Sequence, residues 1–424
     1  MTRVFGLIDA NAFYVSAERA FSPRLRGRAV VVLSNNDGCC VARSSEAKMA
    51  GLKMGDPWHL ASKRPEVRRA EVEWLSSNHA LYGDLSRRMY EVLAARLPRV
   101  EPYSVDEMFL DLSVAGCPVA LSRSLREEVR RVAKVPSCVG IGCTKTLAKL
   151  ANALAKADPG HDGVCDLRDP AGRAGAFAAT PVSEVWGIGA RTAEKLAALG
   201  ADTVARFVAL PSADVRRLLT VTGARVHAEL MGVSCLPLSD APAARKRVAV
   251  TRCFGRPVTR WAEMREAACA HAARAGEKLR AEGLVAARMA VFLHTDPHAR
   301  RGEWYSAQAA GRIEATDDAR ALVAEASRML APLWRGGLEY MKVGVLLDDL
   351  RPKAEEPDAP LFPSRDPARS AALMRALDGV NGRFGRGTLR PLSTGLSRPW
   401  GTRAARRSPR YTTRLEEVLA ATAY

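Results

Sequence analysis

Residues 100–112 read VEPYSVDEMFLDL, and the assignment of the fold depends most on this stretch. Asp106 and Glu107 stand side by side within a run of apolar residues that is typical of a strand. An ionised carboxylate in apolar surroundings is costly unless a cation or hydrogen bonds compensate it. The segment therefore predicts either an edge strand that turns its acids to solvent or a strand whose two acids bind a cation.

A third carboxylate follows the apolar run Val4–Ile8 near the start of the chain. That run predicts a buried strand that delivers Asp9 to the edge of a sheet. Taken alone, Asp9 fits a turn cap equally well. Three carboxylates on strands of one α/β domain instead favour magnesium, which prefers a few carboxylates together with water and substrate phosphates. Two such ions about 4 Å apart can drive in-line phosphoryl transfer.

Strand and helix patterns alternate through residues 1–165, as expected of an α/β domain. Further strands are predicted at 29–33 and 138–142, and helices at 43–50, 80–97, 122–135 and 144–157. Residues 180–237 predict short helices, and Gly187-Ile188-Gly189 opens one of them. Such a turn is typical of a helix-hairpin-helix, in which backbone N–H groups bind a DNA phosphate.

From about residue 245 the pattern changes to β-α-β-β-α-β, which we interpret as a ferredoxin-like arrangement. The strands are predicted at 248–254, 287–294, 305–313 and 341–347, and the helices at 261–282 and 317–334. Residues 351–369 contain five prolines, which is a linker composition. The last 40 residues are rich in arginine and predict irregular structure.

The composition limits the kind of protein this is. A chain of 424 residues exceeds what one core usually serves, so several domains are expected. The formal net charge of +18 predicts a polyanionic partner, either nucleic acid or an anionic membrane. Nine cysteines without a C-x-x-C pair predict a reducing compartment. Because the sequence contains neither a run of about 20 uncharged apolar residues nor a signal sequence, we expect a cytoplasmic protein with no membrane partner.

Basic residues supply candidate contacts for phosphates. A triphosphate needs cations that offset the charge on its leaving group, and the candidates on predicted helices are Lys48, Lys145, Lys149 and Lys156. Residues 245–260 contain six basic residues and no acid in strand-like alternation, which suits a strand that follows a DNA backbone. A solvated basic surface is the alternative in both places. The residues that we interpret as DNA contacts are Gly187, Gly189, Arg245, Lys246, Arg247 and Arg252.

At these residues the sequence resembles the Y-family DNA polymerases, which carry out translesion synthesis. Seven stretches in family order carry the resemblance: DANAFY (9–14), VVLSNNDGC (31–39), KMGDPW (53–58), YSVDE (103–107), TKTLAKLAN (144–152), VWGIG (185–189) and SPRYTTR (408–414). The resemblance implies an α/β multidomain protein with the right-hand architecture of a polymerase. Its expected parts are an α/β palm (1–20 and 75–165), small fingers (21–74), a helical thumb with the helix-hairpin-helix (166–240), a ferredoxin-like little finger (245–350), and a linker with a basic, partner-binding tail (351–424).

The resemblance also implies roles for individual residues. Asp9, Asp106 and Glu107 would be the catalytic ligands of two Mg²⁺ ions, with the backbone carbonyl of Ala10 also near a metal. Phe13 and Tyr14 would lie beside the nucleotide sugar, with Tyr14 as the steric gate that clashes with a ribose 2′-hydroxyl. Lys48 and Lys156 match the positions that grip the triphosphate.

The implied function is low-fidelity, template-directed DNA synthesis across damaged bases in the SOS response. The implied substrates are primed, damaged DNA and dNTPs, and the implied partners are a UmuD′-like dimer and a RecA filament. Leu361-Phe362 matches the end of the family's peptide for the sliding clamp, although the Gln that usually begins that peptide is missing. Two other hypotheses stay open: a catalytically silent, Y-family-like accessory protein that binds DNA, and a helix-hairpin-helix repair nuclease or glycosylase.

Overall fold

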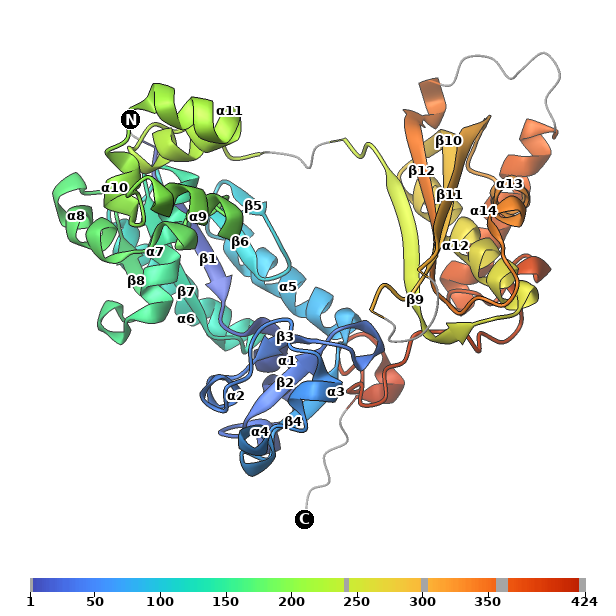
Figure 1. Cartoon of the computed structure of the whole chain (residues 1–424), viewed down its shortest axis with the longest axis horizontal. Helices are drawn as coiled ribbons and strands as arrows, with labels where there is room; N and C mark the ends of the chain where they lie inside the picture. The colour runs from blue at the N-terminus through green and yellow to red at the C-terminus, as the bar shows by residue number, and fades with distance from the viewer. Residues whose placement is uncertain (1–2, 240–243, 299–303, 356–364, 419–424) are drawn as a thin grey trace. The chain divides into compact units, whose positions relative to one another are not determined.

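The protein is a mixed α/β protein of two compact units, seen here in a computed structural model (Figure 1). The structure describes residues 3–239, 244–298, 304–355 and 365–418. Unit 1 takes Met1–Ser34, Gly38–Pro242 and Ala405–Tyr424, and unit 2 takes Asn35–Asp37 and Ala243–Ala404. No helix within the described ranges is long and apolar enough for a membrane span.

The main sheet of unit 1 has the strand order β5-β6-β1-β7-β8. Its strands are β1 (Phe5–Ala10), β5 (Val100–Pro102), β6 (Glu107–Asp111), β7 (Ser137–Gly142) and β8 (Val164–Asp166). Successive side chains of β1 point to opposite faces of the sheet. Ile8 packs in the core with residues of α5 (His79–Ala94) and α6 (Pro118–Ala133), whereas Leu7 packs with Ala148 of α7 (Lys145–Ala157). The sheet therefore separates two helical layers.

A second sheet in unit 1 has the order β3-β2-β4. Its strands are β2 (Val30–Leu33), β3 (Cys40–Arg43) and β4 (Glu73–Ser76). The helices nearest in sequence are α1 (Phe13–Phe21), α2 (Ser45–Met49), α3 (Trp58–Ala61) and α4 (Pro65–Arg69). The helices predicted in 180–237 are present as α9 (Ala190–Ala198), α10 (Val204–Val208) and α11 (Ser212–Leu230). One more helix, α8 (Pro170–Ala179), precedes them.

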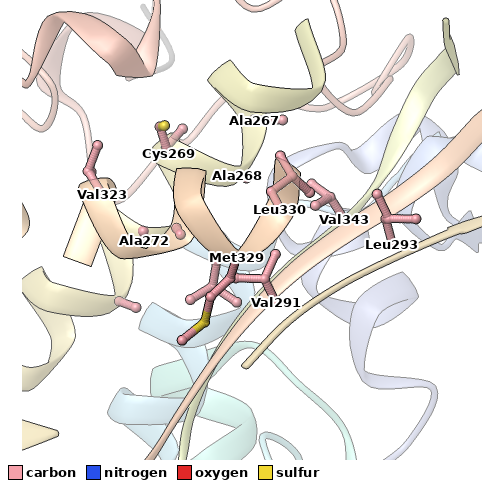
Figure 2. Close-up of a cluster of buried hydrophobic side chains, with 14 of the residues drawn as sticks. Ala267, Ala268, Cys269, Ala272, Val291, Leu293, Val323, Met329, Leu330 and Val343 are labelled. Atoms are coloured by element: carbon pink, nitrogen blue, oxygen red, sulfur yellow. The ribbon is translucent and has the colours of Figure 1, made fainter. Parts of the chain in front are cut away.

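Unit 2 has the predicted element order β-α-β-β-α-β. Its elements are β9 (Val248–Val258), α12 (Trp261–Ala281), β10 (Leu284–Thr295), β11 (Ser306–Thr316), α13 (Ala319–Leu330) and β12 (Tyr340–Pro352). Figure 2 shows the core, in which small residues of α12 such as Ala268 and Ala272 lie against Met329 and Leu330 of α13. Because these alanines have short side chains, both helices can approach the sheet and each other closely.

The strand order in unit 2 corrects one expectation. The order is β11-β10-β12-β9 with antiparallel neighbours, so the second and fourth strands are central, whereas a ferredoxin-like sheet has its first and third strands in the centre. The physical reason lies in the burial of the strands. β10 and β12 bury apolar side chains such as Val291 and Val345, whereas β11 alternates between exposed and partly exposed residues. A polar strand is stable at the edge, and apolar strands need neighbours on both sides.

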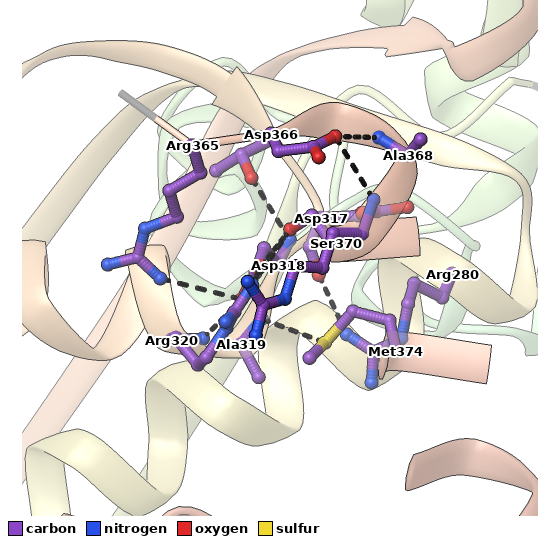
Figure 3. A network of polar contacts seen from close by, with 12 residues as sticks. Arg280, Asp317, Asp318, Ala319, Arg320, Arg365, Asp366, Ala368, Ser370 and Met374 are labelled. Carbon is purple, nitrogen blue, oxygen red and sulfur yellow. Dashed lines mark hydrogen bonds and ion pairs between the residues drawn. The ribbon is translucent and has the colours of Figure 1, made fainter. Parts of the chain in front are cut away.

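A helix that the sequence analysis did not predict, α14 (Pro367–Phe384), lies in the stretch interpreted as linker and tail. Figure 3 shows how its first turns dock in unit 2: Ser370 donates a hydrogen bond to Asp318, and the sulfur of Met374 accepts one from the N–H of Ala319. Further along α14, Asp378 pairs with Arg280 at 2.6 Å. Met374 is the one buried residue of this helix. The sequence of α14 therefore lacks the regular spacing of buried apolar residues by which a helix is predicted.

Candidate active site

The two strands β1 and β6 bring the predicted carboxylates together. Asp9 and Glu107 are directly opposite in the antiparallel register, so their side chains share the face of the sheet that α7 covers. Asp106 immediately precedes β6, and its backbone carbonyl accepts a hydrogen bond of 3.0 Å from the N–H of Ala10. Three acids from segments about 100 residues apart in sequence thus meet at one end of this strand pair.

Each carboxylate has a polar partner in this structure. Lys156 Nζ lies 2.5 Å from Asp9 Oδ2, and Lys149 Nζ lies 2.9 and 3.0 Å from the two oxygens of Glu107. Ser104 Oγ donates a hydrogen bond of 2.5 Å to Asp106 Oδ1. Across the described ranges, no three His, Cys, Asp or Glu side chains are grouped closely enough to hold a metal ion. Two lysine ammonium groups therefore provide the positive charge beside Asp9 and Glu107.

Helix α7 positions both lysines. Its N-cap Thr144 accepts a hydrogen bond from the N–H of Leu147, and Lys149 and Lys156 are seven residues apart, on the same face. Asn152 ties the helix to the sheet because its Nδ2 donates to the carbonyls of Leu7 (3.2 Å) and Cys138 (2.8 Å).

Gly140 of β7 allows the close approach of this helix. A Cβ atom at residue 140 would lie 2.1 Å from both the carbonyl oxygen of Ala148 and the amide nitrogen of Asn152. No residue larger than glycine therefore fits unless α7 moves away from the sheet.

The electrostatics of the carboxylates fit a divalent cation. Burial raises the pKa of Asp9 to about 6; Lys156 opposes this shift, while the charges of Glu107 and Asp106 add to it. The sheet thus holds like charges close together in a partly buried place. Carboxylate oxygens are the donors that magnesium prefers, and an ion of charge +2 would relieve the repulsion among these acids more fully than one ammonium group.

A sharp turn places Tyr14 beside this site. Ala12, which precedes α1, has a left-handed backbone conformation (φ 46°), which is strained for a residue with a Cβ atom. The ring of the half-buried Tyr14 stacks on Tyr82 at a centroid distance of 4.2 Å, and His79 lies edge-on at 6.1 Å. Burial and the nearby charge of Asp106 raise the pKa of Tyr14. Phe13, the other predicted aromatic, is buried in the core.

An aromatic group on the other side of Glu107 was not anticipated from the sequence. Lys149 Nζ lies 4.4 Å from the ring centroid of Tyr103 and 5.3 Å from that of Trp186. Nearby, the buried Lys145 pairs with Glu101 at 2.6 Å. The sequence contained one signal for this aromatic group: Tyr103 belongs to the motif YSVDE and Trp186 to the motif VWGIG.

Several predicted residues lie apart from the carboxylates. Lys48 is exposed on α2 and makes no hydrogen bond or ion pair with the three acids in the described structure. Gly187 (φ 90°) and Gly189 are exposed in the turn that begins α9. The four basic residues predicted to contact DNA are exposed on unit 2: Arg245, Lys246, Arg247 and Arg252, of which Arg245 pairs with Glu282 at 3.1 Å. Leu361 and Phe362 lie outside the described residues.

Comparison with protein families gives matches over most of the chain. Residues 8–153 match the impB/mucB/samB family, and residues 245–359 match the C-terminal domain of that family. Residues 371–421 match a domain of unknown function. The first match contains all three carboxylates and Lys149, whereas Lys156 lies three residues beyond its end.

Similar proteins match over almost their full length. Protein MucB of Salmonella typhimurium is 41% identical over 424 residues, which is 99% of this chain and 100% of that protein. Protein UmuC of the same species is 40% identical over 422 residues, 98% of this chain and 99% of that protein. A DNA polymerase IV of Desulfatibacillum aliphaticivorans is 26% identical over 397 residues, 91% of this chain and 95% of that protein.

Proposed function

This chain belongs to the impB/mucB/samB family, and from that premise we propose that Asp9, Asp106 and Glu107 are the catalytic carboxylates of a Y-family translesion DNA polymerase. The observation that carries the proposal is the direct pairing of Asp9 with Glu107, beside Asp106, on two neighbouring strands. The reaction forms a bond between the primer 3′-oxygen and the α-phosphorus of a dNTP, and it releases pyrophosphate. Such a site must hold several negative charges in one place.

The proposed cofactor is a pair of Mg²⁺ ions held by the three carboxylates and the backbone carbonyl of Ala10. When bound, magnesium makes the primer hydroxyl a better nucleophile and neutralises charge on the leaving pyrophosphate. The acids themselves hold the metal, and Ser104 restrains the carboxylate of Asp106. A serine hydroxyl beside the acid fixes its rotamer, which preorganises the site.

The two lysines have a second task in this proposal. With magnesium bound, Lys149 and Lys156 are no longer needed as counter-ions of Glu107 and Asp9. Their ammonium groups are then available for the phosphate oxygens of the nucleotide, whose charge grows on the leaving group. We assign Lys156 to the triphosphate on this ground. Lys48, which is exposed on α2, remains a second candidate.

Tyr14 is the proposed steric gate, and Phe13 supports it from the core. Tyr14 is on the first turn of α1, close enough to Asp106 for that charge to affect its pKa. A ring beside the metal carboxylates is well placed to exclude a nucleotide with a 2′-hydroxyl, because rejection of a bulky group needs a rigid obstacle.

The remaining assignments concern DNA and protein partners. The glycine turn before α9 and four exposed basic residues of unit 2, namely Arg245, Lys246, Arg247 and Arg252, are the proposed contacts with the DNA backbone. The palm, fingers, thumb and little finger keep the boundaries given above. We propose action in the cytoplasm during the SOS response, with a UmuD′-like dimer, a RecA filament and, through Leu361-Phe362, a sliding clamp.

The test is primer extension with the purified full chain, magnesium, a UmuD′-like dimer and an activated RecA filament. We expect Asp106→Asn and Glu107→Gln to lose extension by at least about 10²-fold while DNA binding persists. Asp111→Asn, on the same strand β6, is the matched control and should extend normally.

Three other results would contradict the proposal. Equal extension by the wild type and both variants would remove the carboxylates from catalysis. Intact DNA binding without extension by any form, with the partners present, would favour the accessory protein. Cutting of duplex DNA without added nucleotides would favour the repair nuclease.

A further inference from the structure

A segment near the C-terminus completes unit 1. We call residues 405–412 the C-terminal strap. The strap runs along the end of β4: the N–H of Ser76 donates to the carbonyl of Arg406 (3.1 Å), and the N–H of Arg406 donates to Ser76 Oγ (3.0 Å). A parallel bridge joins Ser76 to Arg407. Farther along, the ring of Tyr411 stacks on Phe21 at the end of α1, 4.9 Å between centroids.

The strap reaches a buried carboxylate on α1. Glu18 is 1% exposed, and its Oε1 accepts hydrogen bonds from Tyr82 Oη (2.7 Å) and from Ser408 Oγ (2.9 Å). Burial raises the pKa of Glu18, and these two hydrogen bonds oppose the shift. Ser408 thus provides one of two hydroxyl groups that stabilise this carboxylate away from water.

Asn78 holds Ser408 in place. Its Nδ2 donates to Ser408 Oγ (2.9 Å), to the Ser408 carbonyl (3.0 Å) and to the Pro409 carbonyl (3.0 Å), while its Oδ1 caps α5 by accepting from the N–H of Leu81. The strap, the start of α5 and the middle of α1 therefore form one hydrogen-bonded unit. Such a network is rigid when all its members are satisfied.

The network ends at the proposed gate. Tyr82, whose hydroxyl is fixed by Glu18, presents its ring face to Tyr14 at 4.2 Å with an interplanar angle of 15°. Glu18 is also four residues after Tyr14 on α1, so both tyrosines are tied to the same carboxylate, one by a hydrogen bond and one by the helix. A change in the position of Tyr82 moves the surface on which Tyr14 rests.

We propose that the C-terminal strap is a positioning element for the sugar gate, with Ser408 acting through Glu18 and Tyr82 on Tyr14. This inference rests on the proposed function, because it takes Tyr14 as the gate. It gives a role to part of the segment 371–421, which matches a domain of unknown function. Ser408 touches neither metal nor nucleotide in this proposal; it sets the angle and rigidity of a ring that does.

The experiment measures incorporation of a dNTP and of the matching rNTP by the full chain with its partners. Loss of one hydrogen bond to a buried carboxylate is expected to reduce the preference for dNTP about 5-fold in Ser408→Ala. Ser408→Thr, which keeps the hydroxyl, should restore the preference. Ser397→Ala, an exposed serine of the same C-terminal region in unit 2, is the matched control and should behave as the wild type. Tyr82→Phe removes the other hydroxyl and should reproduce the effect of Ser408→Ala.

A double variant separates positioning from general damage. If Ser408 acts through Tyr14, Ser408→Ala should change sugar preference little further in a Tyr14→Ala background. A lower melting temperature with unchanged preference in both Ser408→Ala and Tyr82→Phe would overturn the inference and leave a structural role. Unchanged sugar preference in Tyr14→Ala alone would instead overturn the gate assignment on which the inference rests. If Tyr14→Ala changes the preference for dNTP but Ser408→Ala keeps the wild-type preference, the role of the strap is rejected and the gate assignment stands.

Discussion

The contact between α7 and β7 makes Gly140→Ala a sensitive test of how the lysines reach the carboxylates. The new Cβ atom would lie 2.1 Å from backbone atoms of Ala148 and Asn152, whereas ordinary contacts are 3.4–4 Å. The helix must therefore withdraw from the sheet by roughly 1 Å or more. Because the obstacle is backbone and not a flexible side chain, we expect the free energy of unfolding to fall by about 3 kcal/mol.

The same movement should reduce catalysis. Withdrawal of α7 takes Lys149 and Lys156 away from Glu107 and Asp9, and a misplacement of about 1 Å can cost about 10²-fold in rate. We expect a loss of that size in kcat/KM for single-nucleotide extension, measured at a temperature where urea titration shows the variant to be folded. Gly175→Ala is the control, since a Cβ atom at this exposed position of α8 meets nothing within 4 Å. Wild-type stability and rate in Gly140→Ala would refute the packing argument.

Three further changes test other parts of the chain. Arg320 and Ser370 hold the pKa of the buried Asp318 at about 2, below its ordinary value, so its charge should stabilise unit 2 by about 2 kcal/mol above pH 4. The stability difference between the wild type and Asp318→Asn in urea titrations should therefore shrink as the pH falls from about 4 to 2, and a constant difference would contradict this. Glu229→Ala should lower the free energy of unfolding by at least about 3 kcal/mol in the same assay, because the buried Glu229 accepts hydrogen bonds from four donors around the start of α7 and the end of α11. A decrease below about 1 kcal/mol would show that these hydrogen bonds do not stabilise the fold. Leu361→Ala with Phe362→Ala should reduce clamp-stimulated extension but not basal extension, and unchanged stimulation would leave that dipeptide as linker.

The local part of the site could be predicted from the sequence because it depends on short patterns. The structure confirms the strand that contains Asp9 at the end of its apolar run. In VEPYSVDEMFLDL it confirms a strand that contains Glu107, but Asp106 lies in the turn between β5 and β6. The pairing of Asp9 with Glu107 could not be predicted, because the register of two distant strands is set by the cores on both faces of the sheet. The same limit applied to unit 2, where the element order was confirmed and the strand order was wrong.

The network around Glu18 shows a different limit. Ser408 and Glu18 are 390 residues apart, and neither belongs to a periodic pattern that could suggest contact. A glutamate within an amphipathic helix is normally solvated, but Glu18 is buried, and a distant segment donates one of its hydrogen bonds. Tyr82 belongs to the helix predicted at 80–97, and no motif in the sequence distinguishes it. Its second role, under the ring of Tyr14, depends on the angle between two helices.

The route of the chain through the two units bears on how the protein is made. Unit 1 is interrupted after Pro242, and its last segment begins at Ala405. At about 5–20 residues per second, a ribosome needs roughly ten to thirty seconds to synthesise the intervening chain. During that time the segment that carries Ser408 has not been made, so Glu18 cannot receive the hydrogen bond that Ser408 donates in the folded chain. A chain that terminates before residue 405 would carry all three catalytic carboxylates and still lack the segment that completes its N-terminal unit.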